Sequence, residues 1–90
     1  MNKQTSLLRW EQLRNSGDEN FLILFNDDQN TFDHVIKSLV EVCGHDSIQA
    51  EQCALIAHFN GSCEVRAGSL SVLKSMKSRL EKKGLECAVI

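Results

Sequence analysis

The sequence predicts an α/β fold of the α+β kind, a two-layer sandwich in which three helices cover one face of a small three-stranded sheet. Short apolar segments of strand length alternate with longer segments whose apolar residues recur at helical spacing, in the order β-α-α-β-α-β. Glycine and other turn-forming residues separate most of these segments. The 90 residues suffice for one domain with one modest core.

The first predicted strand covers residues 21–25, where an apolar run ends at the turn-forming pair Asn26 and Asp27. Residues 1–20 are polar and mixed, so we expect a flexible N-terminal extension followed by a core at residues 21–90. A short amphipathic helix is the alternative for part of the extension, because three apolar residues there fall at helical spacing: Leu7, Trp10 and Leu13.

The first predicted helix follows the turn after this strand. Either Asn30 or Thr31 is available as its N-cap, and Gly44 ends it, because glycine adopts the left-handed conformation of a helix end without penalty. Its apolar residues recur at helical spacing, namely Phe32, Val35, Ile36, Leu39 and Cys43.

A second helix starts after Asp46, which together with Gln49 resembles a capping box, and it ends at Asn60-Gly61. A helix of this length in a two-layer fold buries one side against the sheet. We expect that buried side to carry Ile48, Cys53, Ile56 and Ala57.

The remaining predicted elements are a strand, a helix and a last strand. Alternation over residues 63–67 points Cys63, Val65 and Ala67 to one face. Gly68-Ser69 then turns the chain into a third helix that ends at Gly84, and residues 85–90 form the last strand. The narrow apolar stripe of the third helix consists of Leu70, Leu73, Met76 or Lys77, and Leu80.

Composition excludes several classes of protein. The formal net charge of -2 argues against a nucleic-acid-binding domain, which usually carries a clustered basic excess. No apolar stretch approaches the roughly 20 residues of a membrane span, so we expect a cytoplasmic protein without a membrane partner. The four cysteines contain no C-x-x-C pair, and we interpret them as reduced, mostly buried small hydrophobes. We therefore expect neither a metal nor a cofactor.

An enzyme is not expected either. The chain has no Gly-rich phosphate loop, no nucleophile elbow and no zinc-protease motif. Asp27 and Asp28 are adjacent on an extended segment, so their carboxylates point to opposite sides and do not share a reacting group. Cys53 and His58 lie on one predicted helix but five positions apart, where side chains do not face each other well.

A binding site for a protonated amine is the hypothesis that the polar residues favour. A free α-amino group is mainly an ammonium at neutral pH, with three donors and one positive charge. An amide oxygen, a carboxylate and a neutral imidazole nitrogen complement it, and Asn26, Asp27 and His58 supply one of each. The alternatives are an ordinary turn for the aspartates and a histidine near a helix C-terminus for His58.

The stretch from Phe21 to Gly61 resembles the ClpS adaptor family. The resemblance rests on an apolar strand followed by Asn26-Asp27-Asp28, on the helical segments starting at Thr31 and Gln49, and on His58-Phe59-Asn60-Gly61. The predicted order of elements also agrees with the core of that family, and the resemblance extends over residues 20–90.

This resemblance implies an adaptor that binds substrate proteins with an N-degron, by a free N-terminal Leu, Phe, Tyr or Trp. It also implies delivery to a Clp-type AAA+ ATPase, ClpA or ClpC, with its ClpP peptidase. By position, Asn26, Asp27 and His58 would hold the α-amino group, while Asp28 would serve the turn. The pocket for the first side chain would be shaped by Asn30, Phe32, Val35, Ala54, Ala57 and Leu85.

Two departures from the family pattern leave the preferred first residue open. Phe32 stands where the family usually has a methionine, and Ala54 is smaller than the methionine usual at its position. The alternative function is a non-enzymatic interaction domain of the same fold that docks on a partner through its helical face.

Overall fold

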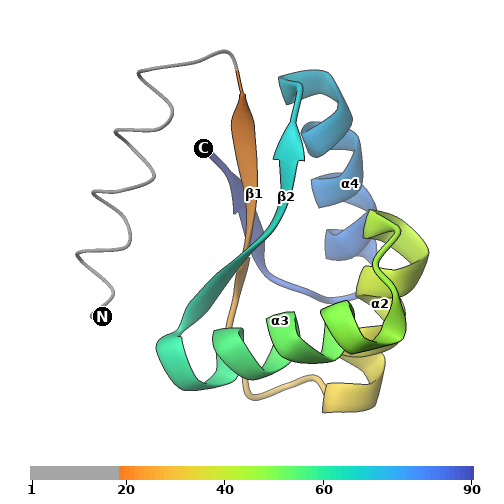
Figure 1. The fold of residues 1–90 in the computed structure, drawn as a ribbon, viewed down its shortest axis with the longest axis vertical. Coiled ribbons are helices and arrows are strands. Elements are labelled where there is room, and N and C mark those ends of the chain that lie inside the picture. The colour runs from red at the N-terminus through yellow and green to blue at the C-terminus, as the bar shows by residue number, and fades with distance from the viewer. Residues whose placement is uncertain (1–18) are drawn as a thin grey trace.

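The computed structural model describes residues 19–90, which form a three-stranded antiparallel sheet with three helices packed on one side (Figure 1). The strands are β1 (Asn20–Phe25), β2 (Ser62–Gly68) and β3 (Cys87–Val89), and the helices are α2 (Phe32–Cys43), α3 (Ser47–Asn60) and α4 (Leu70–Lys82). The predicted fold class and the order β-α-α-β-α-β are thus confirmed. Most of the predicted N-terminal extension, including Leu7, Trp10 and Leu13, lies outside the described residues.

Strand β1 is the centre of the sheet, in the order β2-β1-β3. It pairs antiparallel with both neighbours, and its Leu22 and Leu24 belong to the main hydrophobic core. Both leucines are almost completely buried. A central strand cannot shift its register without moving such residues out of the core, so its end at Phe25 is fixed in space.

Helix α2 begins and ends where the sequence predicts. Of the two expected caps, Thr31 is the one used: its Oγ1 accepts a hydrogen bond from the His34 backbone N–H at 3.1 Å. Gly44 ends the helix with a φ of 71°, a conformation that residues with a Cβ rarely adopt. The chain leaves the sheet at Asn26, and the Thr31 cap fixes the start of α2 five residues later.

Helix α3 has the predicted bounds but a different buried side. The expected residues Ile48 and Ile56 are 69% and 44% exposed. Of the predicted residues, Ala57 is buried and Cys53 is half-buried, and the remaining buried positions are Ala50 and Ala54. The prediction was wrong for the two isoleucines because apolar residues occur all round this helix, so periodicity does not define one side. Alanines on the inner side let the helix approach the sheet closely.

Strand β2 confirms two of its three predicted inward residues. Cys63 and Val65 are buried, but Ala67 is exposed. Leu22 pairs with Arg66 and Ile23 pairs with Glu64, which leaves Val65 as an extra residue in a β-bulge. A bulge interrupts the alternation of faces, and this places Ala67 on the outside.

Helix α4 packs on the core through Leu73 and Leu80, while Leu70, which was expected in the same stripe, is 44% exposed. The last strand is shorter than the predicted range 85–90, but two backbone hydrogen bonds between Phe21 and Ile90 continue its pairing with β1. None of the helices in the described part of the chain is long and apolar enough to span a membrane.

Candidate functional site

A cavity lies where β1 ends, between the start of α2 and the last turns of α3. The backbone N–H of Asn26 donates to the Gly61 carbonyl at 3.0 Å and thereby joins the end of β1 to the end of α3. Gly61 has a φ of 90° and donates its own N–H to the Ala57 carbonyl at 2.9 Å. The cavity holds about 360 Å³ of empty space, part of it open to solvent.

The cavity brings together eight of the nine predicted site residues. Leu85 is the exception: it is only 3% exposed and packs in the hydrophobic core, not against the cavity. Sequence reasoning missed Leu24 and Phe25, although their position directly before Asn26 in the strand could have indicated them. The full lining is Leu24, Phe25, Asn26, Asp27, Asn30, Phe32, Val35, Ala54, Ala57 and His58.

The Asp27 carboxylate organises the turn between β1 and α2. Its Oδ1 accepts hydrogen bonds from the backbone N–H groups of Gln29 and Asn30, both at 2.9 Å. The Asn30 side-chain amide donates to Oδ1 and Oδ2, at 3.1 Å each. Three of the four bonds therefore end on Oδ1, and Oδ2 is the oxygen with more acceptor capacity left for a ligand.

The charge on Asp27 is stabilised by the same contacts. Burial alone would raise the pKa of the carboxyl group. Hydrogen bonds from the Asn30 side chain and from the backbone of Asn30 and Gln29, with a smaller contribution from His34, outweigh that effect and lower the pKa. Asp27 is thus a carboxylate at neutral pH and in mild acid.

Asn30 has a more polar role than the predicted one of shaping an apolar pocket. Besides its bonds to Asp27, its Nδ2 donates to the Gly84 carbonyl at 2.9 Å. One turn into α2, the His34 Nε2 donates to the Lys83 carbonyl at 2.7 Å. These two bonds connect the turn that follows α4 to the start of α2. The Asn30 amide, which makes one of them, also donates to the Asp27 carboxylate.

Asp28 is exposed and does not line the cavity. The prediction that Asp27 and Asp28 point to different sides agrees with this placement. The prediction that Asp28 serves the turn is wrong, because the turn contacts are made by Asp27. The reason is that a side chain accepts from backbone N–H groups two and three residues on, and Asp27 has the correct spacing to the start of α2.

His58 projects from the last turn of α3 between two aromatic rings. The centroid of its imidazole lies 5.3 Å from that of Phe32, and 4.9 Å from that of Phe59, with both pairs edge-to-face. Within residues 19–90, neither the His58 ring nitrogens nor the Asn26 side-chain amide takes part in a hydrogen bond, and Asp27 retains acceptor capacity. Three different acceptors therefore face the same cavity with capacity for a ligand.

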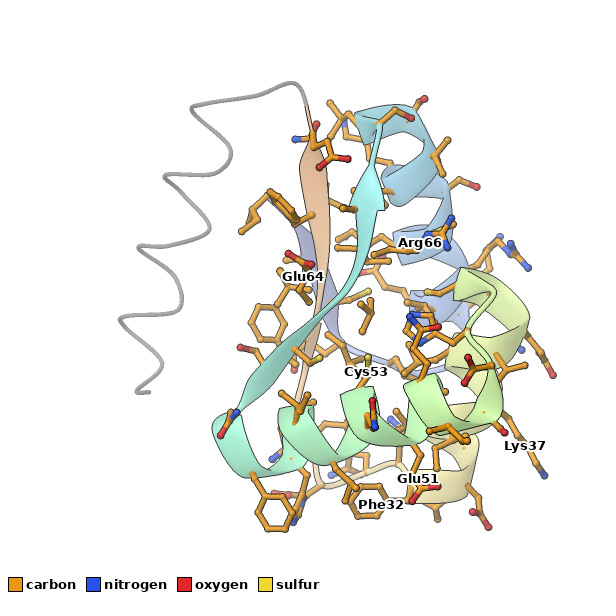
Figure 2. The ribbon with its side chains drawn as sticks, viewed as in Figure 1. Phe32, Lys37, Glu51, Cys53, Glu64 and Arg66 are labelled. Carbon is orange, nitrogen blue, oxygen red and sulfur yellow. The ribbon has the colours of Figure 1, made fainter. Side chains whose placement is uncertain are left out.

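An apolar wall completes the cavity. Ala54 and Ala57 are buried on α3, Val35 is half-buried on α2, and Phe32 is 43% exposed at the edge of the molecule (Figure 2). The two alanines leave open the space that larger side chains would fill. An apolar wall beside polar acceptors suits a ligand with one cationic and one apolar end.

The cysteines do not form a second site. All four are free, and Cys43, Cys63 and Cys87 are buried. Burial raises the pKa of the Cys43 and Cys87 thiols to about 11, so both stay protonated at neutral pH. Cys53 points from α3 toward the sheet (Figure 2), and a hydrogen bond with Cys63 lowers the pKa of its thiol. No group of three metal-binding side chains occurs among the described residues.

Comparisons with known proteins relate this chain to a family. The family model described as ATP-dependent Clp protease adaptor protein ClpS matches residues 16–88. No curated protein matches the chain. Among solved structures, the fold is similar to that of Agrobacterium tumefaciens ClpS2 bound to L-phenylalaninamide, with a TM-score of 0.71 and 19% identity. The likeness covers 81% of this chain and 95% of that one, and at this identity it shows the fold alone.

Proposed function

Because the chain belongs to the ClpS family of ATP-dependent Clp protease adaptors, we propose that it binds substrate proteins by their free N-terminal residue and delivers them to a Clp ATPase and its peptidase. The observation that carries the proposal is the cavity, in which Asn26, Asp27 and His58 adjoin an apolar wall. An N-terminal residue has two parts that complement this site: an ammonium group for the acceptors and a side chain for the apolar wall.

The α-amino group offers one positive charge and three N–H donors. The Asp27 carboxylate supplies the opposite charge through Oδ2, the Asn26 amide supplies a carbonyl oxygen, and a neutral His58 supplies a ring nitrogen. Such charge-assisted hydrogen bonds are roughly twice as strong as neutral ones. Acetylation of the substrate removes the charge and two of the three donors, so an acetylated N-terminus leaves two of these three acceptors without a partner and the carboxylate without a counter-charge.

The first side chain enters the space between Phe32, Val35 and the alanines of α3. Full burial of a leucine or phenylalanine side chain contributes about 1.5–3 kcal/mol. The cavity suits a leucine or an aromatic residue of the Leu, Phe, Tyr or Trp type. The solved ClpS2 structure contains L-phenylalaninamide, a free amine with an aromatic side chain, and this supports the same class of ligand here.

Fluorescence polarisation tests the binding step. We expect labelled peptides that begin with Leu, Phe, Tyr or Trp to bind, and the same peptides to lose binding when acetylated. Asp27→Ala should weaken binding at least tenfold, since hydrogen bonds to charged groups contribute about 1.5–3 kcal/mol. Asp28→Ala removes the same charge one position away and is the matched control.

Two outcomes would contradict the proposal. Binding that survives acetylation would point instead to docking through the helical face, without recognition of a free N-terminus. Equal effects of the Asp27 and Asp28 substitutions would show that net charge matters and not a carboxylate in the cavity.

Delivery is tested separately by degradation. A reporter protein beginning with Phe should be degraded faster by ClpA or ClpC with ClpP when the adaptor is present, and Asp27→Ala should remove that acceleration. Acceleration that persists in the Asp27→Ala variant would show that delivery does not depend on binding in the cavity.

A further inference from the structure

Phe59 is the most exposed large hydrophobic residue in the described part of the chain, at 77%. A single exposed apolar residue requires no explanation by itself. Phe59 shares with Phe32 a contact that the other exposed apolar residues among residues 19–90 are not seen to make, because its ring lies edge-on against the imidazole of His58. The most exposed large apolar residue thus packs against His58, a side chain that we place in the amine site.

The three rings of Phe32, His58 and Phe59 form a continuous aromatic rim. Phe32 lines the cavity, His58 stands between the two phenylalanines, and Phe59 extends the rim beyond the cavity. The rim is well anchored, because the last turn of α3 is tied to β1 through the Gly61 carbonyl and the Asn26 N–H. A ring held in this way provides a contact surface at a small cost in conformational entropy.

The rim is a surface over which the chain of a substrate bound by its first residue can leave the cavity. In an extended chain, side chains alternate between two faces, and residues two apart lie on the same face at about 6.6 Å. With the first side chain in the cavity, the second points away from the surface and the third returns to it. A path from the wall at Phe32 past His58, whose ring centroid lies 5.3 Å from that of Phe32 and 4.9 Å from that of Phe59, brings the third side chain toward the Phe59 ring.

Resting on the proposed function, we propose that Phe59 contacts the side chain of the third substrate residue and makes the protein select large apolar or aromatic residues there. Aromatic pairs prefer edge-to-face or offset arrangements, which the exposed Phe59 ring can offer to a substrate ring. Phe59 is then a specificity-determining residue, distinct from the residues that hold the amino group.

The test uses the full chain and peptides with a free N-terminal Phe that differ only at positions two and three: Phe-Ala-Phe, Phe-Phe-Ala and Phe-Ala-Ala, each with a common tail. The wild-type protein should prefer Phe-Ala-Phe over Phe-Ala-Ala by roughly two- to tenfold. Phe59→Ala should remove that preference, and Phe59→Tyr, which keeps the ring, should retain it.

Ile48→Ala is the matched control, since Ile48 is 69% exposed on the same helix but lies in its first turn, far from His58. It should leave the preference unchanged. The inference is overturned if Phe59→Ala weakens all three peptides by the same factor, because Phe59 then acts only by orienting His58. It is also overturned if the preference concerns position two, or if none exists in the wild-type protein.

Failure of the proposed function gives a different result. Acetylated Phe-Ala-Phe would then bind as well as the free peptide, whatever residue occupies position 59. A wild-type protein that depends on the free amine but shows no third-residue preference, or a Phe59→Ala variant that keeps the preference, would overturn the role of Phe59 alone.

Discussion

Asp27 combines a structural contact and a charge in one side chain. Its Oδ1 holds the turn into α2, while Oδ2 retains capacity toward the cavity. From the sequence, a turn and an amine site are alternatives for this residue. In the structure they are compatible, because one carboxylate oxygen takes most of the turn contacts and the other retains capacity for a ligand. Asn30 was assigned to the pocket, but its bond to the Gly84 carbonyl connects residues 54 positions apart and has no signature in local sequence.

Asn30→Ala should weaken peptide binding by about five- to thirtyfold, because it removes the side-chain donor that orients the Asp27 carboxylate. Gln29→Ala is the matched control, since it keeps the backbone N–H that bonds to Asp27 and should change the affinity less than twofold. Titration calorimetry with a Phe-starting peptide measures both. Equal affinities of the two variants would contradict a positioning role for Asn30.

The lowered pKa of Asp27 also predicts how stability depends on pH. A carboxyl group with a lower pKa in the folded state stabilises the fold above its ordinary value of 3.8, and this contribution is lost as pH falls through the folded value. The difference in unfolding free energy between the wild type and Asp27→Asn should therefore be larger at pH 7 than at pH 3. Urea denaturation at both pH values measures it, and a difference that grows in acid would contradict the assignment.

The helices and strands differ in how far their sequences determine their packing. Helix α2 has one apolar stripe and two end signals, so its bounds follow from the pattern. Its buried side follows only in part, because Leu39 and Cys43 are buried as predicted while Phe32 is 43% exposed. Helix α3 has equally clear ends, but apolar residues surround it, and only the tertiary contacts decide that its alanines face inward. Strand β2 shows the same limit, since its bulge at Val65 depends on pairing with β1.

The inner side of α3 predicts two contrasting substitutions. Ala50→Leu should destabilise the fold by about 1–3 kcal/mol, because Ala50 is completely buried and additional methyl groups overpack the core. Ile48→Ala should change stability by less than about 0.5 kcal/mol, since Ile48 is mostly exposed. Urea unfolding distinguishes them, and the reverse order would mean that the helix is rotated relative to this description.

As a whole, the fold brings three segments that are distant in the sequence together at one cavity. The β1–α2 turn provides Asn26 and Asp27, the end of α3 provides His58, and the turn after α4 supports them through Asn30. The sequence predicted which residues gather there because the family motifs fix their order. It could not predict that Leu85 lies in the core behind the cavity, since that depends on how α4 and β3 pack.

Residues 1–20 are predicted to contribute to delivery and not to peptide binding. Deletion of residues 2–18, which keeps β1 complete, should change peptide affinity by less than twofold while slowing adaptor-dependent degradation of a Phe-starting reporter. Unchanged circular dichroism and urea unfolding of the deletion variant provide the folding control. A large loss of peptide affinity in a folded variant would contradict this division.

The central claim is that the cavity recognises a free amino group together with the adjoining side chain. Titration calorimetry with L-phenylalaninamide and N-acetyl-L-phenylalaninamide tests it most directly, because the two compounds share the side chain and differ only at the amine. We predict binding of the free amine, no measurable binding of the acetylated compound, and loss of binding in Asp27→Ala. Equal binding of both compounds by the wild-type protein would contradict the claim.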